Sequence, residues 1–338
     1  MECIAKCNLE RCNMIVTVTT VVVLVIGLLS LGLALYGGYV SSAIVEGFKG
    51  GEESQHMSEQ KYYLLGMIGV VVLIARLFTV PIFFWMLQSL VPYCPGAMCA
   101  YGVVNAGAPY SVIDVVLKLL LPFAYGLWLI VELANRGQPN LPFAGQLAKS
   151  FVLVLLPLVI LDSAMDVLFV ASIKPVYVPC CSSVYDVNPP FSPSSVLGSG
   201  FGTALMALAV SLSVILIVIQ WVTHESSLMW ILTMVTCGLA AVFYVVMVHD
   251  SYAPLLLGIP THHCPYCLFQ EFPDTAFFAG LFWLGVASAG WRVALQANWK
   301  TKHLAVDDTH RLTGFLRKVS SVALLFSMVS VVSHLLLL

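Results

Sequence analysis

Eight runs of apolar residues, each about 20 residues long, recur along the chain between shorter polar stretches. They lie at residues 14–37, 62–88, 110–133, 151–172, 201–222, 228–249, 276–295 and 319–338. A helix of this length crosses the roughly 30 Å of hydrocarbon in a bilayer, and the runs lack the strict alternation typical of membrane β-barrels. Because lipid offers no partners to the backbone, such segments must be helical. The pattern predicts an all-α integral membrane protein, a polytopic bundle of about eight transmembrane helices surrounded by the lipid bilayer.

Composition agrees with this prediction and excludes one class of partner. Hydrophobic residues make up 60% of the chain and charged residues only 9%, compared with about 25% charged residues in ordinary soluble domains. The formal net charge of −2 gives no basic excess for a nucleic-acid backbone, and no zinc-finger spacing is present. We therefore expect a membrane protein with no nucleic-acid partner.

The lysine and arginine residues are divided unequally between the two ends of the predicted helices. Ten lie in the connections 38–61, 134–149, 223–227 and 292–318. Only Lys6, Arg11 and Lys174 lie in the N-terminal segment or in the other connections. Cytoplasmic loops carry an excess of basic residues, so the first set is expected in the cytoplasm and both termini outside. Lys6 and Arg11 argue in the opposite direction for the N-terminus.

Nine of the ten cysteines fall on this predicted outer side, whereas Cys237 lies within a span. The nine are Cys3, Cys7, Cys12, Cys94, Cys99, Cys180, Cys181, Cys264 and Cys267. Disulfides form and persist outside the cytoplasm, so the cysteines independently favour extracytoplasmic loops. A disulfide between the adjacent residues Cys180 and Cys181 would be strained and does not form readily. They are candidates for disulfides to other loops.

Two outer connections share a Cys-Pro pair and suggest an internal duplication. Cys94-Pro95 follows the second predicted span and Cys264-Pro265 follows the sixth. Four spans return a chain to its starting side, so the spacing is compatible with two parallel four-helix repeats. The predicted organisation is a first four-helix unit at 1–172, an outer loop rich in Pro, Ser and Cys at 173–200, and a second four-helix unit at 201–338. The alternative is that the pair arose twice by chance.

The sharpest chemical motif is the CxxC of Cys264 and Cys267, which directly follows His262 and His263. This spacing brings two sulfurs close enough to cycle between dithiol and disulfide. A thiolate is favoured near a helix N-terminus or a protonated imidazole, which raises its reactivity. The motif therefore indicates a thiol redox centre, with structural disulfides as the main alternative.

The tetrapeptide CPYC is similar, over four residues, to the active-site motif of glutaredoxins. More broadly, outer-face cysteines on a helix bundle resemble membrane thiol oxidoreductases of the DsbB and vitamin K epoxide reductase type, although this chain has more spans. The resemblance implies electron transfer between cysteine pairs and a quinone cofactor. It also implies two redox pairs here, one of Cys264 and Cys267 and a second of Cys94 with Cys99 or of Cys180 with Cys181.

Metal and haem are weaker interpretations of the same segment. His262, His263, Cys264 and Cys267 offer imidazole and sulfur, which suit zinc or copper. Consecutive histidines point in different directions, however, so we do not expect both to ligate one ion. A covalent haem requires CxxCH, whereas Leu268 follows the second cysteine. The sequence therefore predicts neither a metal site nor a covalent haem.

Charged residues inside the spans form a second class of candidate. Arg76 lies near the middle of the second span, and Asp162 and Asp166 share one face of the fourth because they are four residues apart. A charge in the bilayer costs at least about 2.5–3.5 kcal/mol, which predicts an ion pair between Arg76 and one aspartate. Asp114 and Lys118, one turn apart, predict a local pair. The functional alternative is a path for protons or substrate.

These features lead to one functional hypothesis and two rivals. The hypothesis is a membrane thiol–disulfide oxidoreductase that exchanges electrons through extracytoplasmic cysteine pairs with a quinone or an outer-face redox protein. The first rival is a membrane transporter that uses Arg76, Asp162 and Asp166. The second is a non-catalytic subunit of a membrane complex, held together by structural disulfides.

Overall fold

The computed structural model describes residues 15–47, 52–138, 141–174, 177–179, 181–186, 192–222, 226–302 and 307–337. This part of the chain is helical and contains no strand. Eight of its helical segments are long and apolar enough to cross a membrane. The predicted all-α, polytopic membrane fold is thereby confirmed. Cys3, Cys7, Cys12 and Cys180 lie outside the described residues, as do the predictions made for them.

The chain divides into two compact units. The first comprises Met1–Tyr125 and Gly145–Cys180, and the second comprises Gly126–Ala144 and Cys181–Leu338. The long helix α4 (Tyr110–Arg136) therefore begins in the first unit and ends in the second.

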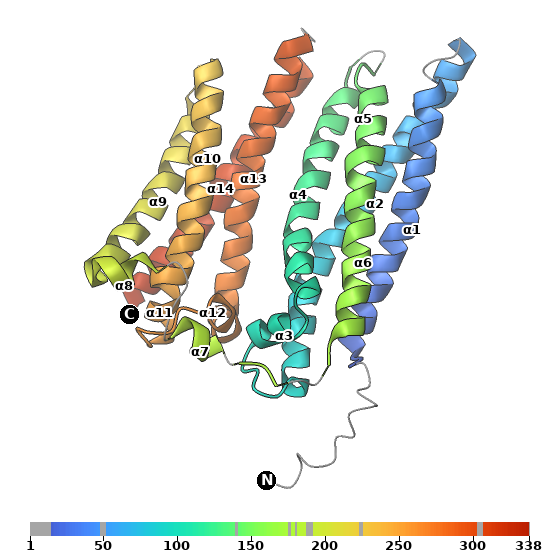
Figure 1. Cartoon of the computed structure of the whole chain (residues 1–338). Helices are drawn as coiled ribbons and strands as arrows, with labels where there is room; N and C mark the ends of the chain where they lie inside the picture. The colour runs from blue at the N-terminus through green and yellow to red at the C-terminus, as the bar shows by residue number, and fades with distance from the viewer. Residues whose placement is uncertain are drawn as a thin grey trace. The chain divides into compact units, whose positions relative to one another are not determined.

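Four spans supply helices to the first unit (Figure 1). Besides the beginning of α4, its elements are α1 (Val18–Gly47), α2 (Glu52–Leu90), the 3-10 turn η1 (Val91–Tyr93), α3 (Ala100–Ala106), α5 (Ala144–Ser150), the π-turn η2 (Phe151–Leu155) and α6 (Leu156–Ser172). The segments α5, η2 and α6 together make one span, Ala144–Ser172.

The second unit contains the four remaining spans and several short helices. Its elements are α7 (Cys181–Tyr185), α8 (Pro193–Leu197), α9 (Ser199–Trp221), α10 (Ser227–Met247), the π-turn η3 (Val248–Tyr252), α11 (Ala253–Leu257), α12 (Pro265–Glu271), α13 (Pro273–Lys302) and α14 (Asp307–Leu337). Within this unit α10 packs against α13, where the rings of Tyr244 and Phe282 stack with their centroids 3.7 Å apart.

Each π-turn ends two residues before a proline. Pro157 follows η2 and Pro254 follows η3. Proline lacks an amide hydrogen, and its ring conflicts with the carbonyl four residues earlier, so the preceding turn widens instead of continuing as regular α-helix. The η3 turn thereby leaves backbone groups of α10–α11 available to neighbouring loops.

Glycines let α1 approach the span that contains α6. A Cβ added at Gly37 would lie 2.8 Å from the ring of Phe151, and one at Gly38 would lie 2.8 Å from Leu156. Small residues at helix interfaces permit such close packing in membranes. Nearer the start of α1, a Cβ at Gly27 would lie 3.3 Å from a carboxylate oxygen of Asp166. This close approach brings α1 against the charged residues of the first unit.

The turn between η1 and α3 depends on Gly96, which has a φ of +88°. Beside it, the amide of Val178 donates to the carbonyl of Pro95 at 2.9 Å. A Cβ at Gly96 would overlap the Val178 carbonyl oxygen and lie 2.9 Å from the ring of Tyr177. The position therefore requires glycine both for its backbone conformation and for the space that it leaves.

We expect Gly96→Ala to lower the thermal unfolding midpoint of the detergent-solubilised protein more than Gly198→Ala does. Gly198 has a similar φ of +91° but nothing within 4 Å of an added Cβ. Both variants share the backbone strain of about 1–3 kcal/mol, and only Gly96→Ala adds the contact with Val178. Equal shifts of the two midpoints would show that this contact is unimportant.

Candidate functional site

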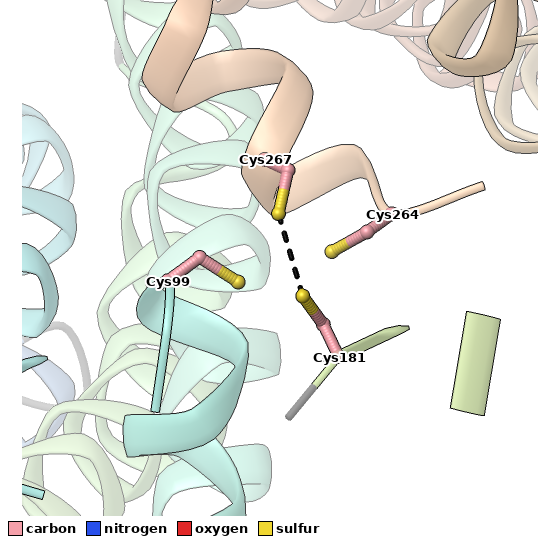
Figure 2. A group of neighbouring side chains, drawn as sticks. All are labelled: Cys99, Cys181, Cys264 and Cys267. Atoms are coloured by element: carbon pink, nitrogen blue, oxygen red, sulfur yellow. Dashed lines mark hydrogen bonds between the residues drawn. The ribbon is translucent and has the colours of Figure 1, made fainter. Parts of the chain in front are cut away.

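Three cysteines of the second unit come together at one end of its helices (Figure 2). The Sγ atoms of Cys181, Cys264 and Cys267 all lie within 4.8 Å of one another, and those of Cys181 and Cys267 are 3.4 Å apart. Cys181 and Cys264 are buried, whereas Cys267 is partly exposed. Cys99, also drawn in Figure 2, belongs to the first unit.

The short helix α12 places the CxxC motif. Cys264 is its N-terminal capping residue, with extended backbone, and Pro265 begins the helix. Proline at this position has its φ already set for a helix and loses no intrahelical hydrogen bond. Cys267 lies three residues after Cys264, so the two side chains share one face of the first turn.

The segment that carries Cys181 is held against the rest of the second unit by contacts of α7 and of the residue that follows it. The carboxylate of Asp186 makes a hydrogen bond with Nδ1 of His262, two residues before the CxxC motif. The ring of Tyr185 meets the ring of His249 edge-on, with centroids 5.6 Å apart. These contacts tie the Cys181 segment to the CxxC loop and to the π-turn η3, and so hold the third sulfur beside the motif.

The π-turn η3 also orders the loops around the three cysteines. The carbonyl of His249 accepts a hydrogen bond from Nδ1 of His263 at 3.2 Å, which fixes the proton of that imidazole on Nδ1. The carboxylate of Asp250 accepts from the hydroxyl of Ser192 at 2.7 Å and from the amide and hydroxyl of Ser194. The turn therefore joins the CxxC loop and the start of α8 to one point of the span.

Three neighbouring sulfurs can support two kinds of chemistry. In thiol–disulfide exchange, a thiolate attacks one sulfur of a disulfide and releases the other, which requires a third sulfur within reach of the pair. Thiolates can also bind a soft metal such as zinc. Within the described residues, the metal-compatible group here contains cysteines only. The imidazoles of His262 and His263 are engaged with Asp186 and with the His249 carbonyl.

The predicted second pair, Cys94 and Cys99, flanks the turn between η1 and α3 in the first unit. Cys94 ends η1 and Cys99 caps α3. Both side chains are buried. Burial raises the pKa of the Cys94 thiol above its ordinary value, which favours the protonated and less nucleophilic form. Pairing and redox exchange of these two residues stay predictions.

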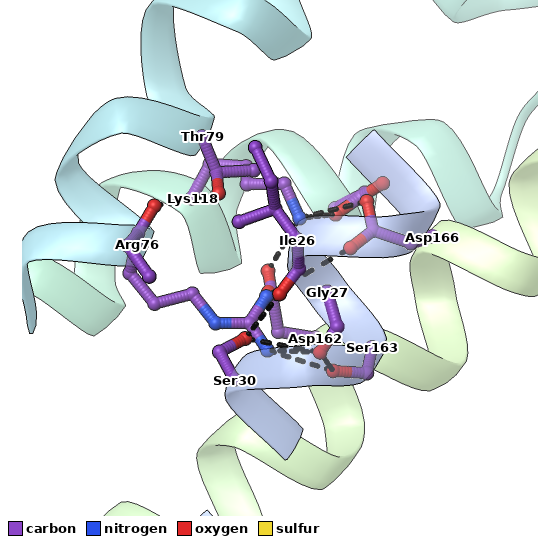
Figure 3. A network of polar contacts seen from close by, with 11 residues as sticks. Ile26, Gly27, Ser30, Arg76, Thr79, Lys118, Asp162, Ser163 and Asp166 are labelled. Atoms are coloured by element: carbon purple, nitrogen blue, oxygen red, sulfur yellow. Dashed lines mark hydrogen bonds and ion pairs between the residues drawn. The ribbon is translucent and has the colours of Figure 1, made fainter. Parts of the chain in front are cut away.

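A second candidate site lies entirely within the first unit, where α1, α2, α4 and α6 meet (Figure 3). Arg76 on α2 forms an ion pair with Asp162 on α6, and its other terminal nitrogen donates to the hydroxyl of Ser163 at 2.7 Å. That nitrogen also lies 3.4 Å from the carbonyl of Gly27 on α1. The predicted pairing of Arg76 with one aspartate is confirmed.

Lys118 on α4 connects three carboxylates of this network. Its Nζ lies 3.0 Å from Asp114, 2.9 Å from Asp162 and 2.8 Å from Asp166. The predicted local pair of Asp114 and Lys118 is confirmed, but the lysine also reaches both aspartates of α6, which one-turn spacing could not indicate. All five charged side chains are no more than 2% exposed.

Comparisons with known proteins give no further guide. No protein-family model, curated protein or solved structure matches the chain. The two clusters of side chains are therefore the basis for a functional proposal.

Proposed function

We propose that the protein is a membrane thiol–disulfide oxidoreductase, with Cys264 and Cys267 as its redox pair. The observation that carries this proposal is the third sulfur, that of Cys181, placed 3.4 Å from Cys267. A CxxC motif that served only as a structural staple would need no third cysteine beside it. In a thiol-exchange centre a third sulfur has a role, because exchange proceeds by attack of a sulfur on an existing disulfide.

The proposed reaction transfers two electrons and two protons from a protein dithiol to a quinone in the membrane. In the first step the dithiol reduces the Cys264–Cys267 disulfide and itself becomes a disulfide. In the second step Cys264 and Cys267 form their disulfide again, and the quinone becomes a quinol. Before the first step, while the Cys264–Cys267 disulfide is intact, the thiolate of Cys181 can attack Cys267, which forms a Cys181–Cys267 bond and releases Cys264 as a thiolate.

The proposal is tested by following thiols and quinol together in the purified, full-length protein. After reduction and removal of the reductant, addition of a ubiquinone analogue should form one quinol for each disulfide gained. An alkylating reagent should modify Cys264 and Cys267 in the reduced protein but not in the protein to which quinone has been added. Mass spectrometry of the peptides would show the difference. The double variant Cys264→Ser/Cys267→Ser should form no quinol.

Cys237→Ser is the matched control. Cys237 is also a buried cysteine of the second unit, and its sulfur lies 3.9 Å from the carbonyl of Val286, within the span. Its replacement should leave quinol formation unchanged. The proposal fails if Cys264 and Cys267 resist reduction, if the double variant keeps full quinol formation, or if the purified protein holds stoichiometric zinc that is lost in the double variant.

A further inference from the structure

The charges buried in the first unit do not balance. Three carboxylates, Asp114, Asp162 and Asp166, face two cations, Arg76 and Lys118, which leaves a net charge of −1 (3 negative against 2 positive). All lie within the predicted membrane spans and are no more than 2% exposed. An uncompensated charge in such surroundings is strongly unfavourable, and the usual outcome is neutralisation. The network therefore requires one further positive charge.

A proton fits this requirement better than a metal ion does. Oxygen atoms of the three aspartates lie within 4.8 Å of one another, as the ligands of a cation would. However, the ammonium group of Lys118 already lies 2.8–3.0 Å from an oxygen of each of them. The lysine thus occupies the position that a metal would take. A proton needs no such space, because it binds directly to a carboxylate oxygen.

Among the three carboxylates, Asp114 has the least compensation. Asp162 contacts both Arg76 and Lys118, and Asp166 lies 2.8 Å from Lys118 and 3.9 Å from Arg76. Asp114 has only its ion pair with Lys118, and neither of its buried oxygens makes a hydrogen bond of normal geometry within the described residues. Its side chain is fully buried.

The remaining groups around the network carry no charge that could replace the proton. The neutral polar groups that lie around the network in Figure 3 are the carbonyl of Gly27 and the hydroxyl of Ser30 on α1, the hydroxyl of Thr79 on α2 and the hydroxyl of Ser163 on α6. The hydroxyls of Ser30 and Thr79 donate to carbonyls of their own helices. In the described part of the chain, no other acidic or basic side chain makes an ion pair with these five residues.

We propose that Asp114 is a proton-binding site in the membrane-spanning part of the first unit. With the network closed, Asp114 is a neutral carboxylic acid, while Asp162 and Asp166 are ionised and paired with Arg76 and Lys118. Release of the proton leaves the network with its uncompensated charge and favours separation of α4 from α6. Buried carboxylic acids of this kind carry protons in pumps and transporters. The inference is independent of the cysteines and of the redox proposal.

The test compares Asp114→Asn with Asp162→Asn and Asp166→Asn in the full-length protein at neutral pH. Infrared spectra recorded in H2O and D2O should contain a carboxylic-acid band that disappears in Asp114→Asn and persists in Asp166→Asn. Asp114→Asn should also keep the wild-type unfolding midpoint, because a neutral amide replaces a neutral acid. Asp162→Asn should lower it by several degrees, since Arg76 then loses its ionised partner.

Glu132→Gln controls for another buried carboxyl group. Glu132 is fully buried and pairs with Arg136 at 2.5 Å, in the part of α4 that belongs to the second unit. This substitution should leave the Asp114-dependent band in place. A wild-type protein without a carboxylic-acid band overturns the proposal. So does a band that survives in Asp114→Asn, or an unfolding midpoint that falls as far in Asp114→Asn as in Asp162→Asn.

Discussion

Replacement of Arg76 by methionine is expected to remove much of the stability of the first unit. Arg76 is 2% exposed and forms the ion pair with Asp162 that joins α2 to α6. Without its guanidinium group, Lys118 alone remains opposite three carboxylates. Removing one partner of a buried ion pair typically costs about 3–5 kcal/mol, because the other charge stays buried. Thermal unfolding of the purified protein, or its yield as a folded monomer in detergent, measures this loss.

Two further variants separate the buried charge from the mere removal of an arginine. Arg311→Met removes an exposed arginine near the start of α14 and should change stability by no more than about 0.5 kcal/mol. The double variant Arg76→Met/Asp162→Asn restores the charge balance and should be more stable than Arg76→Met alone. If Arg76→Met unfolds like the wild type, or if Asp162→Asn does not rescue it, the ion pair is not what holds α2 and α6 together.

The membrane fold could be predicted from the sequence because lipid imposes strict rules on length and polarity. Eight apolar runs of about 20 residues leave helices as the only way to satisfy the backbone. The helix ends were less predictable. For example, α1 extends to Gly47, ten residues beyond the apolar run at 14–37, since a helix can continue into the polar region where apolarity gives no signal. Nor does apolarity identify the π-turns before Pro157 and Pro254.

The two candidate sites were predictable where their residues are close in sequence or where burial forces a partner. The CxxC motif and the pair of Asp114 and Lys118 depend on local spacing. An ion pair between Arg76 and an aspartate was predictable because a charge buried in a span needs an oppositely charged partner. The sequence named Cys181 as a candidate for a bond to another loop but could not identify the CxxC loop as its neighbour, because 82 residues separate Cys181 from Cys264. The position of Cys181 depends on the contacts of the α7 segment with the loop that contains His262.

A Cys181→Ser variant should keep the Cys264–Cys267 disulfide but lose most of its electron transfer. If Cys181 attacks Cys267 during turnover, the quinol-forming rate should fall about 100-fold or more, as is common when a residue of covalent catalysis is removed. The complementary variant, Cys264→Ser, removes the thiol that would displace Cys181. Because the sulfurs of Cys181 and Cys267 are 3.4 Å apart, we expect this variant to accumulate a Cys181–Cys267 disulfide.

Non-reducing peptide mapping by mass spectrometry detects that crosslink directly, and Cys237→Ser again serves as the control with neither effect. The two variants together distinguish exchange from a static staple. In a staple between Cys181 and Cys267, the crosslink would be present in the wild type in full amount and Cys264→Ser would not increase it. A crosslink that appears only after Cys264 is removed, together with the loss of electron transfer in Cys181→Ser, indicates that Cys264 normally resolves it, as thiol exchange requires.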